Sequence, residues 1–124
     1  MFAGSLYKLK SLEVSPEKSN AKSIIILNPC HEIFKGHFPG NTVLPGVCMI
    51  QIIKELVAEI SGKTLMLVTG NTIKFQNPVV PEANKEITAD FKIKHSEGII
   101  SVNAQISSPN IVYSSFKGEF RVKT

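Results

Sequence analysis

The stretch that decides the fold is "PGVCMIQIIKELVAEISG", residues 45–62. Proline suits the first turn of a helix and glycine suits the position just past the last turn. The stretch therefore predicts a helix that opens at Pro45-Gly46 and closes at Gly62. Apolar residues recur between these bounds at three- and four-residue spacing, and others cover most of the remaining sides. A helix this apolar has to be wrapped by the rest of the chain.

The segments around the predicted helix carry the signals of β-strands. Each alternates in polarity or is β-branched, and turn residues such as Glu97-Gly98 and Pro109-Asn110 separate them. The first is expected at an edge of the sheet, and the second, "SIIILN", reads as a buried strand. We therefore predict one α+β domain over residues 1–124, with an antiparallel sheet curled around the helix. The expected strands are 5–14, 23–28, 64–75, 85–96, 98–108 and 111–123.

Composition restricts the classes of function. A chain of 124 residues with 43% hydrophobic and 19% charged residues is typical of one folded domain. Its formal net charge of +4 favours an acidic partner. Nucleic-acid binding is disfavoured, because there is no dense Lys/Arg stripe, no Trp and only two Tyr for base stacking.

The cysteines and the apolar runs indicate a reducing, aqueous compartment. Cys30 and Cys48 are too few for a disulfide framework and have no metal-ligand spacing. The first residues lack the apolar core of a signal peptide, and no apolar run reaches the roughly 20 residues of a membrane span. A cytoplasmic location is expected, and no metal or cofactor is predicted, since no phosphate-binding glycine loop occurs either.

His37 is the first candidate for chemistry. It lies in the long loop "PCHEIFKGHFPGNTVLPG", residues 29–46, which leads directly into the helix. Histidine titrates near neutral pH and can act as a general base. The ordinary alternative is a loop histidine that caps or packs against a neighbour, as expected for His31 and His95.

Gly46 and Gln51 are the other two candidates. The start of a helix has unpaired N–H groups that can hold an anion or polarise a carbonyl, and glycine allows close approach. Gln51 interrupts an apolar run. Its amide is either buried with hydrogen-bond partners, or faces a cavity, or lies on a solvent-facing stripe with Lys54, Glu55 and Glu59.

Two motifs resemble those of the bacterial 3-hydroxyacyl-acyl-carrier-protein dehydratases. "GHFPGNTVLPGV", residues 36–47, is similar to the signature of that family, and "IKFQNPVVPEANKEI", residues 73–87, is similar to its second block. The likeness extends from about Ser23 to Val122. It implies the hot-dog fold, in which one long helix is wrapped by an antiparallel sheet.

The resemblance also implies roles for individual residues. His37 would take the C2 proton of a 3-hydroxyacyl thioester, and the N–H of Gly46 would polarise the thioester carbonyl. Phe38, Pro45 and Val47 would line the substrate site. The family's substrates are carried on acyl carrier protein, and its sites lie at a dimer interface, with the helix residue supplied by the other subunit.

This sequence departs from the family pattern at an important position. The family has an acidic residue fourteen positions after the histidine, where it helps to protonate the departing hydroxyl, and here that position is Gln51. An amide can orient a hydroxyl or a water but cannot act as an acid. The second block also reads Pro81-Glu82-Ala83 in place of Pro-Gly-Asp.

Three functions remain open at this point. The first is a dehydratase in which His37 works without an acid at position 51. The second is a non-catalytic or half-catalytic subunit that pairs in a heterodimer with a related subunit, which supplies the acid. In a homodimer, every site would instead combine His37 with Gln51. The third is an acyl thioesterase, which usually needs a carboxylate that the loop and first helix turns lack apart from Glu32. Activity of the purified chain alone discriminates the first from the second.

Overall fold

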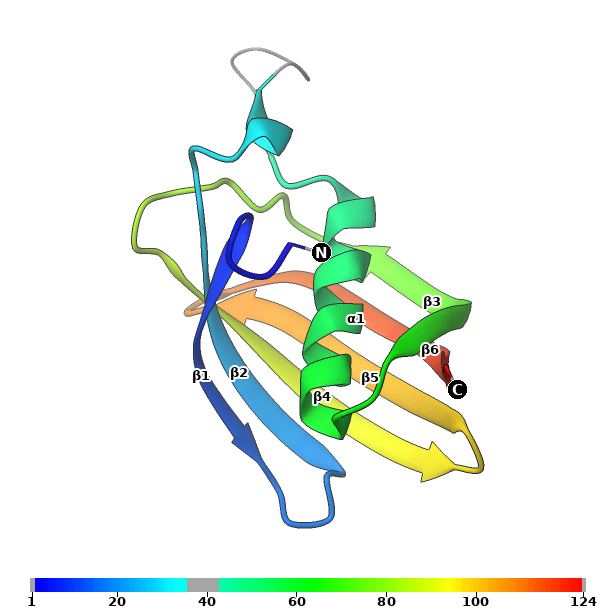
Figure 1. The fold of residues 1–124 in the computed structure, drawn as a ribbon. Coiled ribbons are helices and arrows are strands. Elements are labelled where there is room, and N and C mark those ends of the chain that lie inside the picture. The colour runs from blue at the N-terminus through cyan, green and yellow to red at the C-terminus, as the bar shows by residue number, and fades with distance from the viewer. Residues whose placement is uncertain (1, 36–42, 124) are drawn as a thin grey trace.

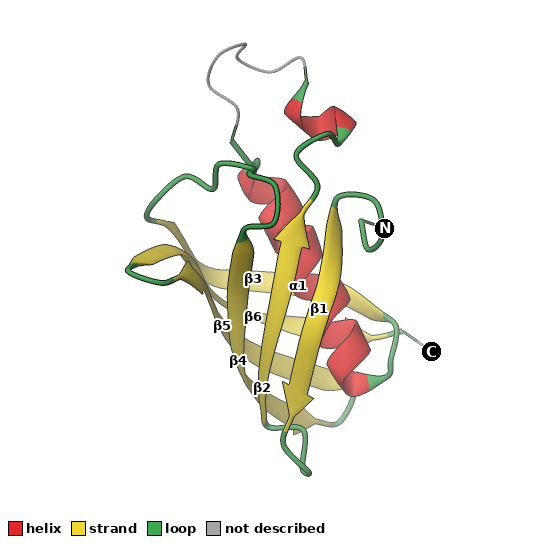
Figure 2. Ribbon diagram, turned by 90° about the vertical axis from the view of Figure 1, so that its left-hand side faces the viewer, coloured by secondary structure: helices red, strands yellow, loops and turns green. Residues whose placement is uncertain are grey.

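One long helix and six antiparallel strands make up the fold of residues 2–35 and 43–123, the part of the chain that this computed structural model describes. The strands form a single sheet in the order β1-β2-β4-β5-β6-β3, and α1 lies across one face of it (Figures 1 and 2). This is the predicted α+β hot-dog arrangement. The elements are β1 (Tyr7–Val14), β2 (Asn20–Leu27), the 3₁₀ turn η1 (Glu32–Phe34), α1 (Gly46–Ser61), β3 (Leu65–Phe75), β4 (Glu86–Ser96), β5 (Ile99–Ser108) and β6 (Ile111–Val122).

The ends of α1 fall where the local signals predict. Pro45 is the N-cap, with extended backbone angles, and the helix begins at Gly46. Gly62 follows the last turn with a φ of 71°, a left-handed conformation that glycine adopts without a Cβ penalty. The N–H of Gly62 donates to the carbonyl of Ala58 at 2.8 Å, which completes the C-terminal cap.

The core lies between α1 and the sheet. Side chains of the helix pack against the inward-facing residues of the strands, and burial of each large apolar side chain contributes about 1.5–3 kcal/mol. The other face of the sheet is polar, so most strands alternate between buried and exposed positions. The core includes Ile52, Ile53, Leu56 and Val57 of α1, and Ile25, Ile87, Val102, Phe116 and Phe120 of the sheet.

β2 differs from its expected burial. The run "SIIILN" predicts a strand buried on both faces, but only alternate residues are fully buried. Ile25 and Leu27 face the core, whereas Ile24 and Ile26 are half-buried. The reason is that α1 covers a single face of the sheet, so the second face of β2 has no layer to pack against.

The two edge strands differ in character. β1, at one edge as predicted, carries polar residues on its exposed positions except at Val14. β3, at the other edge, pairs only with β6 among the described strands and exposes Met66, Leu67 and Val68, each 38–46% accessible. An apolar strand edge with free backbone groups is a surface on which another chain can pair.

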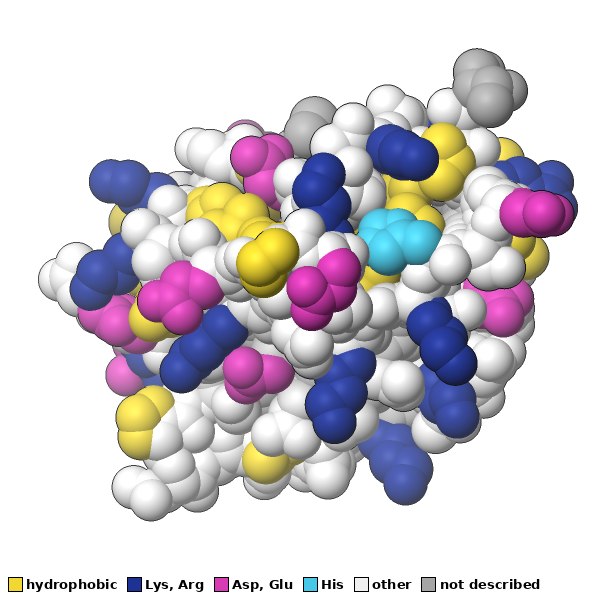
Figure 3. All heavy atoms as spheres, turned by 90° about the horizontal axis from the view of Figure 1, so that it is seen from below, with side chains coloured by type: hydrophobic (Ala, Val, Ile, Leu, Met, Phe, Trp, Pro, Cys, Tyr) yellow, Lys and Arg dark blue, Asp and Glu magenta, His cyan; other side chains and the backbone are white. Residues whose placement is uncertain are grey.

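The molecular surface carries both signs of charge. On the face seen in Figure 3, lysine or arginine and acidic side chains are interspersed rather than gathered into one stripe. No helix within residues 2–35 and 43–123 is long and apolar enough to cross a membrane.

Candidate active site

The N-terminus of α1 presents free backbone donors. The N–H groups of Cys48 and Met49 both donate to the carbonyl of Pro45, at 3.0 and 3.2 Å. The N–H groups of Gly46 and Val47 have no acceptor within the described part of the chain. Together with the helix dipole, these groups form the kind of site that holds an anion or polarises a carbonyl.

A cavity of about 360 Å³ opens beside Gly46. Its walls are mainly apolar, as a site for an acyl group would require. Inside it, the hydroxyl of Ser114 is buried and has no hydrogen-bond partner among the residues described. The cavity is lined by Leu44, Gly46, Met49, Phe75, Gln76, Asn77, Pro78, Val79, Tyr113 and Ser114.

Gly46 has no side chain, and the ring of Phe75 packs closely against it. A Cβ at position 46 would lie 2.7 Å from Cζ of the Phe75 ring, which is shorter than real contacts allow. Phe75 lies at the end of β3 and is 57% exposed. The ring therefore covers the start of α1 from the edge of the sheet and forms one side of the cavity.

Gln51 lies one turn along α1 and is hydrogen-bonded to a carboxylate. Its Nε2 donates to Oε2 of Glu55 at 2.8 Å. Gln51 is half-buried, and Glu55 is buried, with only 8% of its surface exposed. The predicted solvent-facing stripe is thus wrong for Glu55, although Glu59 does lie exposed. Of the alternatives for Gln51, the structure favours an amide with a hydrogen-bond partner.

Glu55 joins the helix to the N-terminal segment of the chain. The backbone N–H of Phe2 donates to Oε2 at 2.8 Å, and the N–H of Ala3 donates to Oε1 at 2.9 Å. The buried hydroxyl of Tyr7 also donates to Oε1, at 3.1 Å. With Gln51, the carboxylate therefore accepts four hydrogen bonds, which satisfies a charge that would otherwise be costly to bury.

These bonds decide the charge state of Glu55. Burial on its own raises the pKa of the carboxyl, but hydrogen bonds from Gln51, Phe2, Ala3 and Tyr7 outweigh it and hold the pKa below the usual range. Burial and the adjacent carboxylate raise the pKa of the Tyr7 hydroxyl, which therefore stays protonated and remains a donor. Glu55 is consequently an ionised acceptor at neutral pH.

Of the other residues predicted for the site, the structure places some at the cavity or the helix start, and others lie elsewhere or outside the described residues. Pro45 caps the helix, and Gly46 lines the cavity. Val47 is 74% exposed and does not line the cavity beside Gly46. His37 and Phe38 lie outside the described residues, so their roles remain predictions.

The remaining histidines and the cysteines have ordinary structural environments. Nδ1 of His31 accepts the N–H of Ile33 at 3.0 Å and caps the turn η1, and Nε2 of His95 lies 3.1 Å from the carbonyl oxygen of Lys18. Burial raises the pKa of the Cys48 thiol, which makes it a poor nucleophile. No cluster of residues suited to a metal ion occurs within 2–35 and 43–123.

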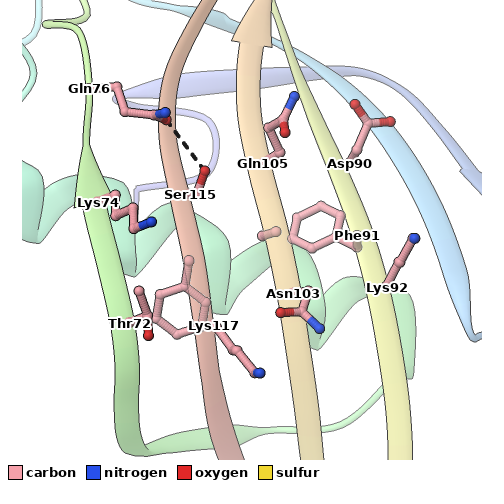
Figure 4. A pocket seen from close by; sticks show the side chains of 12 residues that line it. Thr72, Lys74, Gln76, Asp90, Phe91, Lys92, Asn103, Gln105, Ser115 and Lys117 are labelled. Carbon is pink, nitrogen blue, oxygen red and sulfur yellow. Dashed lines mark hydrogen bonds between the residues drawn. The ribbon is translucent and has the colours of Figure 1, made fainter.

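A second hollow, of about 500 Å³, lies on the face of the sheet away from α1. Figure 4 shows polar side chains projecting from β3, β6, β5 and β4, with α1 behind the strands. Lys74, Lys92 and Lys117 contribute positive charge there, against one carboxylate, Asp90. This surface is cationic, and no signal in the sequence marked it as a separate feature.

Comparison with known proteins identifies the family. A family profile described as ApeI dehydratase matches residues 13–114. The chain belongs to the ApeI-like dehydratase family. The resemblance to dehydratases that the two motifs suggest is thereby confirmed.

Curated relatives of this ApeI-like chain are dehydratases. The 3-hydroxyacyl-(acyl-carrier-protein) dehydratase FabZ of Haemophilus influenzae is 33% identical over 88 residues, which cover 64% of this chain and 57% of that protein. FabZ of Pediococcus pentosaceus is 31% identical over 108 residues, covering 80% and 71% respectively. The match to the first of these relatives spans a little over half of its length.

Solved structures share the fold. The dehydratase heterocomplex ApeI:P from Xenorhabdus doucetiae superposes with a TM-score of 0.73 at 19% identity, covering 92% of this chain and 96% of that one. A hypothetical thioesterase with coenzyme A from Streptococcus pneumoniae gives 0.66 at 10% identity, covering 97% and 90%. The ApeI-like chain is therefore a dehydratase-type hot-dog protein.

The buried hydrogen bond between Glu55 and Gln51 was not predicted from the sequence. The i, i+4 spacing of the two residues was the available signal, because residues four apart lie on one face of a helix and can hydrogen-bond. The backbone donors of Phe2 and Ala3, more than fifty residues away in the sequence, carried no signal at all.

Proposed function

We propose that this ApeI-like chain dehydrates a 3-hydroxyacyl thioester, carried on an acyl carrier protein, to the trans-2-enoyl thioester. The observation that carries the proposal is the free N-terminus of α1 at Gly46, which opens on an apolar cavity directly after the loop that holds His37. A thioester carbonyl on these N–H groups gains negative charge as the C2 proton leaves, so the donors lower the barrier.

In the proposed reaction, one base carries out both proton transfers. The C2–H bond breaks, and its proton moves to the imidazole of His37. The electron pair forms the C2–C3 double bond as the C3–O bond breaks. The departing hydroxyl takes the proton back from His37 and leaves as water, so no acid is required at position 51.

The acidic carrier and a second subunit are the proposed partners. The net charge of +4 suits the acidic carrier protein. The exposed residues Met66, Leu67 and Val68 lie at the start of β3, and Phe75, which packs on Gly46 beside the cavity, lies at its end. A second chain paired along the whole length of β3 would therefore come close to the cavity. That chain is either a second copy or a related subunit, as in the heterocomplex that the fold resembles.

A half-catalytic subunit is the second candidate, and Gln51 is the observation that favours it. In such a pair, His37 of this chain would work with an acid from a related partner. A thioesterase is less well supported, because Glu55 already accepts four hydrogen bonds and has no lone pair directed at a water or a thioester.

The test is dehydration and hydration of an acyl thioester on acyl carrier protein by the purified chain alone. We expect turnover, and we expect His37→Ala to reduce it by at least about a hundredfold, as loss of a general base does. His95→Ala is the matched control, since His95 lies exposed at the end of β4. An active His37→Ala contradicts the proposal, and a folded wild type without turnover favours the half-catalytic subunit.

A further inference from the structure

Ser114 differs from the other buried polar residues of the chain. Besides the tyrosines, the polar side chains buried in the described ranges are Ser23, Glu55, Ser61 and Ser114. The hydroxyls of Ser23 and Ser61 each donate to a backbone carbonyl at 3.4 Å, and Glu55 accepts four hydrogen bonds. Ser114 is only 3% exposed, and its Oγ has no partner among these residues. A buried hydroxyl without a hydrogen bond is costly, which points to a partner supplied by a ligand.

Ser114 lies on the sheet side of the cavity beside Gly46, which we call its floor. It pairs directly with Phe75 across β6 and β3, so the two side chains share one face of the sheet. The Phe75 ring reaches from the sheet to the helix start, where its tip packs against Gly46. The hydroxyl of Ser114 and the N–H groups of α1 therefore lie on opposite sides of the cavity, and the ring forms a wall between them.

The other polar side chains that line this cavity already have partners. The amide nitrogen of Asn77 donates to a backbone carbonyl at 2.7 Å, and the hydroxyl of Tyr113 donates to a serine of β5 at 3.2 Å. The amide oxygen of Gln76 accepts a hydrogen bond from a serine of β6 at 3.4 Å. A ligand on the floor of the cavity therefore meets apolar walls and the unpaired hydroxyl of Ser114.

The position of Ser114 determines which part of a bound thioester it meets. The thioester carbonyl is assigned to the N–H groups of α1, and the reacting carbons C2 and C3 follow it directly. Because the Phe75 ring spans the distance from the helix start to the sheet, a hydroxyl on the floor meets the acyl chain beyond these carbons. A plain alkyl chain would leave the hydroxyl unpaired, whereas an oxygen at that point of the chain would accept its hydrogen bond.

We propose that Ser114 is a specificity-determining residue, whose hydroxyl donates a hydrogen bond to an oxygen carried by the acyl chain beyond C3. The site therefore takes oxygen-bearing acyl chains in preference to plain alkyl chains of the same length. The inference rests on the proposed function, because it treats the cavity beside Gly46 as the acyl site. It adds a class of substrate that the reaction itself does not require, since dehydration changes only C2 and C3.

The test compares three ligands of equal length. Hexanoyl-pantetheine amide is the alkyl ligand, and 3-ethoxypropanoyl- and 4-methoxybutanoyl-pantetheine amide replace its C4 or C5 methylene by an ether oxygen. Nitrogen replaces the thioester sulfur in all three, so no turnover occurs during calorimetry. We expect the preference for at least one ether ligand over the alkyl ligand to be about tenfold greater in wild type than in Ser114→Ala, the size of one buried hydrogen bond.

Ser115→Ala is the matched control. It makes the same change at the next residue of β6, whose hydroxyl bonds to Gln76 on the outer face of the sheet, and it should keep the wild-type preference. Ser114→Ala should melt no lower than wild type, because it removes a hydroxyl that makes no hydrogen bond within the described chain. A clear loss of stability would reveal a structural partner for this hydroxyl and overturn the inference.

The binding and turnover outcomes separate the two proposals. A wild type that turns over a 3-hydroxyacyl substrate, but has the same ligand preferences as Ser114→Ala, overturns the inference and leaves the proposed function standing. An equal loss of preference in Ser115→Ala also overturns it. A preference that depends on Ser114 in a protein without turnover supports the acyl site and rejects the dehydration. A wild type that binds none of the three amides overturns the inference, and turnover then decides the proposed function alone.

Discussion

The residue at position 51 determines how kcat for dehydration depends on pH. In wild type, the proposed base His37 has to be neutral, so kcat should rise with pH and then level off. Gln51→Glu would put a second carboxylate at the position where an amide now lies 2.8 Å from Glu55. Two carboxylates this close cannot both ionise, so the pair would share a proton with a raised apparent pKa.

We therefore expect Gln51→Glu to convert a rising profile into a bell. The shared proton can be donated to the leaving hydroxyl, and kcat should fall again as the pH rises past the apparent pKa of the pair. The measurement is kcat for dehydration between about pH 5 and 9, the range in which a histidine titrates. Superimposable profiles for the variant and wild type would refute this assignment of position 51.

Gly46 is required for space rather than for backbone conformation. In Gly46→Ala, the new methyl meets the Phe75 ring, which is exposed and can move aside. We expect a melting temperature close to that of wild type but a loss of about tenfold or more in kcat/KM, since small displacements at an oxyanion-type donor are costly. A fully active variant would show that the ring and the cavity wall do not matter to turnover.

At the scale of elements, Glu55 joins α1 to the N-terminal segment, and this contact should respond to acid. The folded-state pKa of Glu55 lies below its value in the unfolded chain. The stability it contributes is therefore complete above the unfolded-state pKa, about 4.3, and is lost as the pH falls through the lower folded-state pKa.

We expect Glu55→Gln to destabilise the fold by about 2 kcal/mol near neutral pH, because a backbone N–H then meets an amide NH₂ group. The difference from wild type should shrink on acidification, as the protonated glutamate comes to resemble the glutamine. Denaturant unfolding across acidic pH measures this, with Glu59→Gln as the control on the same helix. A constant difference at every pH would contradict the linkage.

The two edge strands supply a matched pair for testing assembly. We expect Val68→Lys on β3 to prevent association, because a lysine on an apolar strand edge opposes pairing. Val14→Lys on β1 makes the same change at the opposite edge and should leave the mass unchanged. Light scattering on the purified proteins gives the mass, and a Val68→Lys protein as heavy as wild type would exclude this edge.

Elements with local signals could be predicted, whereas properties set by distant neighbours could not. Pro45 and Gly62 mark the ends of α1 within their own turns, so its bounds follow from the sequence. The half-burial of Ile24 depends on α1 covering only one face of the sheet. The burial of Glu55 depends on backbone N–H groups at the other end of the chain, which no side-chain pattern encodes.

At the scale of the whole molecule, the net charge should control how fast the protein associates with acyl carrier protein. The chain has a surplus of four positive charges, and Lys74, Lys92 and Lys117 lie on the outer face of the sheet. We expect kcat/KM for a carrier-borne substrate to fall about tenfold between roughly 0.05 and 0.5 M salt, because salt screens electrostatic steering. A pantetheine thioester is the control, and an equal loss for both substrates would rule out steering by the carrier.

The anchor of the N-terminal segment has a consequence for how this sequence can change over evolutionary time. Glu55 binds the segment through main-chain N–H groups, which every amino acid except proline supplies. Positions 2 and 3 can therefore drift through many side chains without loss of the contact, while the single carboxylate on α1 has no such freedom. Sequence variation should accumulate on one side of this contact and be nearly absent from the other.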